Sequence, residues 1–185
     1  MSVLTAEYIK SFNYINGSNH PDFMELLLAD KYNRTMCEII GNSDPNTIEQ
    51  KGKLFLGRGE DTINKKLVSF DLAVGASMCK LNDTFDNVKI IKLHQITEDI
   101  CVKSYFHNNQ QDLYNILKEI YKTLNNNKNV FVYCQQGKDR SAAIVIAYIM
   151  TIYDVTAQQA LNYILDKRCI VTVNDVEPLW DFLTN

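Results

Sequence analysis

The sequence is poor in the residue patterns that mark disulfide-rich, zinc-binding and membrane-spanning proteins. Its 185 residues include five cysteines, an odd number with no C-x-x-C pair, and only three histidines. This pattern argues against a disulfide framework or a structural zinc site and favours free thiols in a reducing compartment. The longest apolar run, Ala142 to Met150, is too short to cross a bilayer, and the first residues lack a signal-peptide pattern. We therefore expect a cytoplasmic protein without a membrane span.

The chain also lacks a strong charge of either sign. Its formal net charge is −3, so no overall basic field exists to attract nucleic acid, and we expect no DNA partner. A length of 185 residues is enough for one buried core, and neither repeats nor an internal linker interrupt it. The composition predicts one globular domain, preceded by residues 1–50, which carry no recognisable motif.

One stretch, Asn129 to Met150, carries the strongest pattern and reads NVFVYCQQGKDRSAAIVIAYIM. Val130 to Tyr133 is apolar and rich in β-branched and aromatic residues, as expected of a strand that is buried on both faces. Ala142 to Met150 is apolar nearly all round, which predicts a helix through the centre of a core. The polar residues between them predict a turn whose backbone N–H groups face an anion at the start of the helix.

The chemistry of that turn depends on Cys134, Arg140 and Ser141. A thiolate inside a ring of N–H donors, beside the positive end of a helix, can act as a nucleophile. A planar guanidinium can hold two phosphoryl oxygens, and a serine hydroxyl can donate to the sulfur when it leaves. A Cys-x5-Arg pair alone is a weak signal, but its place with a glycine at a strand-to-helix junction strengthens it. The expected anion-binding residues are Gln135, Gln136, Gly137, Lys138, Asp139 and Arg140.

Strands and helices alternate along the rest of the chain, which predicts an α/β fold with a mainly parallel sheet flanked by helices on both faces. We expect strands at Lys53–Leu56, Val68–Val74 and Val88–Leu93, and helices at Glu60–Leu67, Asp112–Leu124, Thr156–Arg168 and from Asn174 onward. Thr156 and Gln159 are spaced as a capping box. Residues 1–50 predict a helical extension, with helices in Val3–Ile15 and Phe23–Ala29, that packs on the domain or mediates a homodimer contact.

The string CQQGKDRS resembles the phosphate-binding loop C-x2-G-x2-R-[ST] of the cysteine-dependent protein tyrosine phosphatase superfamily, in its small dual-specificity branch. Lys53 to Leu67, KLFLGRGEDTINKKL, is similar to the first strand, LG turn and first helix of that family. Arg168 to Asn174, RCIVTVN, is similar to its Arg…Asn segment. The resemblance implies a catalytic domain over residues 51–185 that hydrolyses phosphotyrosine and phosphoserine or phosphothreonine in proteins. The implied reaction passes through a phosphocysteine intermediate and needs no metal and no cofactor.

The same resemblance implies a role for each site residue. Cys134 is the expected nucleophile, Arg140 the phosphoryl clamp, and Ser141 the group that aids release of the thiolate. The family also uses an Asp as general acid, on a loop before the cysteine that here corresponds to His94–Gln111. Asp99 is the expected acid in that loop, with Glu98 as the alternative.

One departure from the family and one unusual residue bear on activity and substrate. The family usually has a His before the cysteine, which helps to hold the loop and favours the ionised thiol, and here that residue is Tyr133. We therefore expect Cys134 to be less activated than in typical relatives. Lys138 resembles the lysine of relatives that accept phosphoinositides. Three alternatives to a protein phosphatase thus stay open: a phosphoinositide phosphatase, an RNA 5′-triphosphate phosphatase, and a weakly active adaptor that binds phosphorylated partners.

Overall fold

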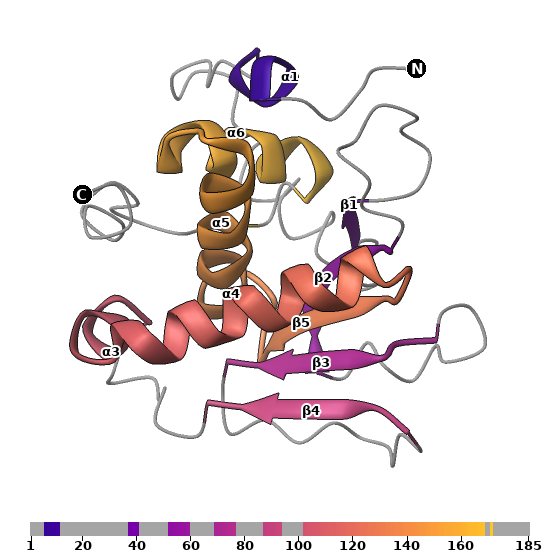
Figure 1. The fold of residues 1–185 in the computed structure, drawn as a ribbon. Coiled ribbons are helices and arrows are strands. Elements are labelled where there is room, and N and C mark those ends of the chain that lie inside the picture. The colour runs from indigo at the N-terminus through magenta and orange to yellow at the C-terminus, as the bar shows by residue number, and fades with distance from the viewer. Residues whose placement is uncertain are drawn as a thin grey trace.

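Five strands form one mixed, mostly parallel sheet with the order β1-β2-β5-β3-β4 (Figure 1). The computed structural model describes residues 6–11, 37–40, 52–59, 69–76, 87–93, 102–168 and 171. The strands are β1 Cys37–Ile40, β2 Leu54–Arg58, β3 Leu72–Gly75, β4 Lys89–Lys92 and β5 Val130–Cys134. Only β1 runs antiparallel to its neighbour among these strands, and the other pairs are parallel. The α/β class expected from the sequence is confirmed.

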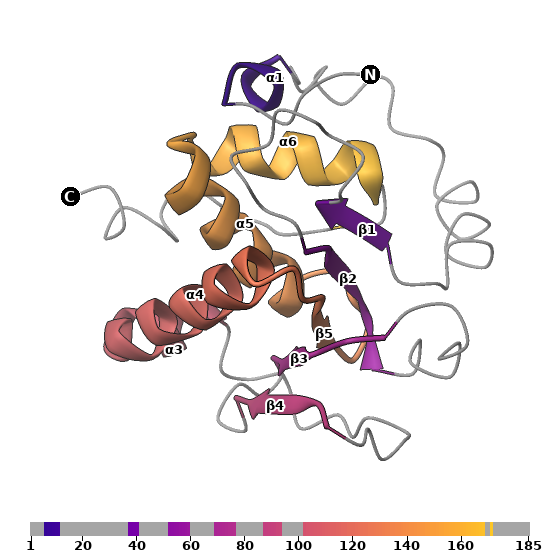
Figure 2. The same cartoon turned by 45° about the vertical axis from the view of Figure 1, so that its right-hand side comes forward.

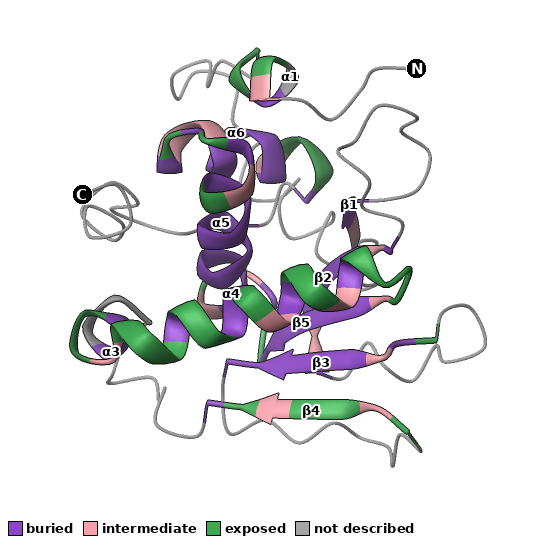
Figure 3. Ribbon diagram, in the orientation of Figure 1, coloured by how far each residue is buried: buried purple, intermediate pink, exposed green. Residues whose placement is uncertain are grey.

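The described helices pack mainly on one face of this sheet (Figure 2), and helices on its other face, which the sequence also predicts, stay a prediction for residues outside the described part. They are α1 Ala6–Lys10, α3 Val102–Asn108, α4 Gln110–Asn125, α5 Arg140–Tyr153 and α6 Ala157–Lys167. Helix α4 buries one stripe, which includes Leu113, Ile116 and Ile120, whereas α5 is buried nearly all round (Figure 3). A helix without a polar face is stable only inside a core, so the position of α5 follows from its composition. The expected helix Glu60–Leu67 lies outside the described residues.

Asn129 joins the starts of the three central strands. Its side-chain Oδ1 accepts a hydrogen bond from the Lys53 N–H at 3.0 Å, and its Nδ2 donates to the Ser69 carbonyl at 2.9 Å. Its own N–H donates to the Asp71 carboxylate at 2.9 Å. Asn129, which directly precedes β5, therefore fixes the register of β2, β5 and β3. The register in turn determines which residues lie at the carboxyl ends of these strands.

The N-terminal extension contributes to the core as well as to the sheet. Ile9 of α1 is fully buried, and Tyr163 of α6 donates a hydrogen bond to the Ile39 carbonyl of β1 at 2.7 Å. Lys53, which directly precedes β2, forms an ion pair with Glu38 of β1 at 2.9 Å. The sequence of residues 1–50 predicts helices but not strand β1, because four residues are too few to show an alternating pattern. The expected helix Phe23–Ala29 lies outside the described residues.

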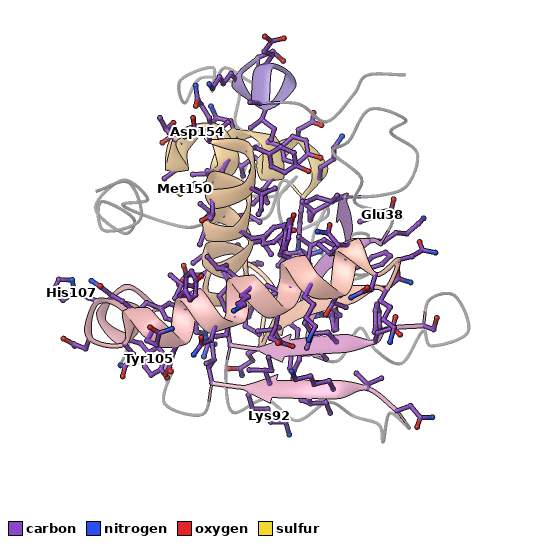
Figure 4. All side chains as sticks on the ribbon, in the orientation of Figure 1. Glu38, Lys92, Tyr105, His107, Met150 and Asp154 are labelled. Carbon is purple, nitrogen blue, oxygen red and sulfur yellow. The ribbon has the colours of Figure 1, made fainter. Side chains whose placement is uncertain are left out.

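Two helix boundaries differ from the expected ones. Residues 94–111 were expected to be a loop, but α3 occupies Val102–Asn108, and α4 begins at Gln110 instead of Asp112. The Tyr105 hydroxyl donates to the Asp112 carboxylate at 2.7 Å across the junction of these helices. Tyr105 is labelled in Figure 4. Burial, with the hydrogen bond and charge of Asp112, raises the pKa of Tyr105 to about 12. Burial of aromatic side chains, which a short polar sequence does not reveal, stabilises α3.

The helix that follows α5 begins as the sequence predicts. The Thr156 hydroxyl accepts from the Gln159 N–H at 3.2 Å, and the Gln159 side chain accepts from the Thr156 N–H at 2.9 Å, which completes the capping box. The helix expected from Asn174 lies outside the described residues. In the part of the chain that the structure describes, no single helix is long and apolar enough to cross a membrane, and only the pair α5 and α6, bent by 119°, matches by length and composition.

Replacing Asn129 with Ala tests its role as the joint between the strands. We expect the free energy of unfolding to fall by about 1–3 kcal/mol, because the Lys53 N–H and the Ser69 carbonyl lose their partner. Urea unfolding followed by circular dichroism measures the change. Asn126→Ala is the matched control, since its side chain only bonds the Lys122 carbonyl one helical turn back, and it should cost less than about 0.5 kcal/mol. Equal losses for the two variants would contradict the assigned role.

Candidate active site

The candidate site lies where the central parallel strands end. Cys134 is the last residue of β5, and Arg58, the last residue of β2, is its partner in the register. Gly57 of β2 and Gly75 of β3 both pair with the preceding residue, Tyr133. Parallel strands in register bring their carboxyl ends to one edge of the sheet, which is where ligands bind in open α/β folds.

The sulfur of Cys134 receives hydrogen bonds from the loop that follows it. The Gly137 N–H donates to Sγ at 3.1 Å, and the Ser141 hydroxyl donates to it at 3.2 Å. Cys134 and Ser141 are both buried. A loop that directs several hydrogen-bond donors at one point is suited to bind an anion there.

Gly137 is the residue on which the loop turns. Its φ of +67° lies in the left-handed region, which residues with a side chain rarely adopt. A Cβ at this position would also lie 2.6 Å from the carbonyl carbon of Gly57 and 2.7 Å from its oxygen. The loop thus rests directly on the end of β2, and glycine is required both by the backbone angle and by the space.

Cationic residues lie in this loop and beside it. Arg140 is the first residue of α5, whose unpaired N–H groups and positive dipole end also favour an anion. Lys138 and Arg58 are half-buried, and Arg168, from the end of α6, is buried and donates from Nε to the Gly137 carbonyl at 3.0 Å. The loop between Cys134 and Arg140 holds one acid, Asp139. Although this residue as a whole is exposed, partial burial of its carboxyl raises its pKa, and the neighbouring Arg140 opposes that rise.

The structure brings together most of the residues that the sequence singled out. Cys134, Gly137 and Ser141 are in direct contact, and Arg140 starts the helix beside them. Gln135 and Gln136 are exposed on the outer part of the loop. Asp99 and Glu98 lie outside the described residues, so the identity of the general acid stays a prediction. Among the described residues, no three His, Cys, Asp or Glu side chains are grouped to hold a metal ion.

Two residues of the site were not identified from the sequence. Arg58 adjoins Cys134 through the pairing of two strands that are far apart in the chain, and Arg168 reaches Gly137 from 31 residues away. The sequence did hold one signal for Arg168, because this residue begins the segment that resembles the Arg…Asn segment of the family. Neither contact can be read from local spacing, because both depend on the packing of whole elements.

Tyr133 points away from Cys134, onto the opposite face of the sheet, because neighbouring side chains of a strand alternate. Its ring stacks on Phe131 at 5.5 Å between centroids, in a buried cluster of Phe55, Phe70, Ala73, Phe131 and Tyr133. A Cβ on Gly75 would lie 2.5 Å from the Tyr133 hydroxyl oxygen and 2.6 Å from Cζ. The tyrosine at position 133 therefore requires a glycine on the neighbouring strand.

The site combines a buried cysteine at the end of a central parallel strand with a glycine turn and an arginine at a helix start. This arrangement is typical of the fold and site of cysteine-dependent phosphatases. The chain matches the family model of the dual specificity phosphatase catalytic domain over residues 54–181, and it belongs to that family. It is 34% identical over 94 residues to protein 123R of Invertebrate iridescent virus 6, named as a tyrosine phosphatase, covering 46% of this chain and 66% of that one.

Solved structures share the fold at low sequence identity. DUSP15 superposes with a TM-score of 0.60 at 16% identity, covering 80% of this chain and 87% of that chain. PTPMT1 in complex with PI(5)P gives a TM-score of 0.55 at 14% identity, covering 71% of this chain and 90% of that chain. The chain spans only between 23% and 66% of the lengths of three curated relatives that it matches.

The dependence of Tyr133 on Gly75 can be measured by a double-mutant cycle. Gly75→Ala should lower the free energy of unfolding by about 1–3 kcal/mol, because the new methyl group collides with the Tyr133 ring. Tyr133→His, the residue usual in the family, shortens the side chain and should relieve that collision, so that the two changes are coupled by more than about 0.5 kcal/mol. Urea unfolding of the two single variants and the double variant gives the coupling. Additive losses would show that the two residues do not share this space.

Proposed function

We propose that the protein is a dual-specificity protein phosphatase that hydrolyses phosphate monoesters of tyrosine, serine and threonine. The observation that carries this proposal is the buried Cys134 sulfur, to which Gly137 and Ser141 donate hydrogen bonds at the start of α5. Membership of the family supports the same reaction. Arg58, Lys138 and Arg140 lie at this edge of the sheet together with one acid, Asp139, although the whole chain is slightly acidic.

The proposed reaction has two steps. In the first, the Cys134 thiolate attacks phosphorus, the P–S bond forms, and the P–O bond to the substrate breaks as an acid protonates the departing oxygen. In the second, water attacks phosphorus, gives up a proton to the same group, and releases inorganic phosphate and the thiolate. Arg140 and the loop N–H groups stabilise the phosphoryl oxygens, and Ser141 donates to the sulfur as the P–S bond breaks.

A phosphoinositide is the second candidate substrate. Lys138 lies half-buried in the loop itself, where its ammonium can contact an additional phosphate. The complex of PTPMT1 with PI(5)P is a precedent on a similar fold, at 14% sequence identity. Hydrolysis of a phosphotyrosine peptide, PI(5)P and 5′-triphosphate RNA, measured side by side, distinguishes the proposed substrates. An adaptor that only binds phosphate would turn over none of them.

The proposal extends to location and assembly. The odd number of cysteines without C-x-x-C pairs supports a cytoplasmic location. In the N-terminal extension, Ile9, Ile39 and Ile40 are buried within the same chain, which supports a packing role for the described part of that extension. A homodimer contact through the extension stays a prediction, and gel filtration of the full chain tests it.

Replacing Cys134 with Ser tests the covalent mechanism. We expect turnover of an aryl phosphate to fall below about 10⁻³ of the wild-type rate, because a hydroxyl is a far weaker nucleophile than a thiolate. Binding of inorganic phosphate should persist, since the loop N–H groups remain. Arg140→Ala should lose both binding and turnover, whereas Lys118→Ala, an exposed cation on α4, should lose neither. Undiminished turnover by Cys134→Ser would refute the phosphatase mechanism.

The choice of general acid can be tested through the leaving group. An alkyl oxygen needs a proton to leave, and a nitrophenolate does not. If Asp99 is the acid, Asp99→Asn should slow alkyl phosphates on the order of 10²–10⁴-fold and nitrophenyl phosphate much less. Glu98→Gln is the matched control and should change both rates little. The reverse pattern would assign the role to Glu98. If neither change has an effect, the triphosphate substrate is favoured, because its pyrophosphate-type leaving group departs without a proton.

A further inference from the structure

Arg168 joins the end of α6 to the centre of the phosphate loop. Its backbone N–H makes the last i→i−4 bond of α6, to the Ile164 carbonyl at 2.7 Å, while its side chain turns into the protein and is only 2% exposed. Nε donates to the Gly137 carbonyl at 3.0 Å, and Nη2 lies 3.0 Å from the position that a Cβ of Gly137 would occupy. Burial of a guanidinium costs free energy. The interactions that the buried group makes have to offset that cost.

The Gly137 carbonyl is the group that matters for an anion site. A loop that binds phosphate must direct N–H groups inward and carbonyl oxygens away, because a carbonyl oxygen repels phosphoryl oxygens. Gly137 has the backbone freedom of glycine, and its N–H bonds the Cys134 sulfur. A donor on the carbonyl of the same residue holds that oxygen outward, and it restricts the rotation that would withdraw the N–H from the sulfur.

We propose that Arg168 is a positioning residue of the active site. It fixes Gly137 in its left-handed conformation so that the Gly137 N–H points at the Cys134 sulfur and the Gly137 carbonyl points away from the bound phosphoryl group. Arg168 acts through Gly137 and does not touch the substrate. Its effect on turnover rests on the proposed phosphatase function, whereas its effect on the sulfur does not.

Two substitutions at Arg168 and one beside it separate positioning from packing. Arg168→Met keeps an unbranched side chain but removes the donor, and Arg168→Lys keeps the charge without the planar fork. Lys167→Met is the matched control, because the Lys167 ammonium lies beside Asp166 and 5.7 Å from the Tyr163 ring centroid instead of at the loop. Circular dichroism and thermal unfolding show which full-length variants are folded.

The decisive measurement is the pH dependence of Cys134 alkylation by iodoacetamide, followed on the Cys134 peptide by mass spectrometry. In Arg168→Met the alkylation curve should move to higher pH, because the sulfur loses the aligned Gly137 donor, and kcat/KM on an aryl phosphate should fall on the order of 10²-fold. Arg168→Lys should recover part of both, and Lys167→Met should match the wild type. A role in packing alone would lower thermal stability without moving the alkylation curve.

The outcomes are distinct from those that test the proposed function. A folded Arg168→Met variant with the wild-type alkylation curve and wild-type kcat/KM overturns the inference, as does an equal effect of Lys167→Met. If Arg168→Met does not fold, Arg168→Lys decides by the same two measurements, and a wild-type result there also overturns it. If the wild-type chain hydrolyses no phosphate ester, the proposed function fails, and the alkylation curve alone then decides the role of Arg168.

Discussion

The site depends on the parallel pairing of β5 with β2 on one side and β3 on the other. Asn129 bonds to the starts of these strands, and the register then carries Cys134 to the same edge as Gly57 and Gly75. Because side chains alternate along β5, the sulfur faces the helices and the Tyr133 ring faces away from them. A shift of one residue in this register would exchange those two faces and move the Cys134 sulfur away from its loop.

Gly137 is the point at which separate parts of the chain meet. It rests on the Gly57 carbonyl at the end of β2, donates to Cys134 at the end of β5, and accepts from Arg168 at the end of α6. Each contact comes from an element that is itself held by the core, so the loop is fixed from three sides. Rigid donors around the sulfur need little reorganisation when negative charge develops there.

Departures from the expected pattern are compensated locally. Tyr133 replaces the usual His, and its ring occupies space that only a glycine at position 75 leaves open.

The N-terminal extension adds β1 at the edge of the sheet and the buried Ile9 to the core, so its described part belongs to the same packed unit as the phosphatase domain. Lys89 of β4 and Glu119 of α4 form an ion pair between the other edge of the sheet and a covering helix.

The sequence by itself determined the central strand, the helix after it, the capping box at Thr156 and the residues of the phosphate loop. These features depend on local composition and short spacing, which a single chain displays directly. Helix α3, strand β1 and the contact of Arg168 with Gly137 were decided only by the tertiary structure. They come from burial of short segments, from strand pairing and from a hydrogen bond across 31 residues, and the free energy of each depends on partners that the local sequence does not contain.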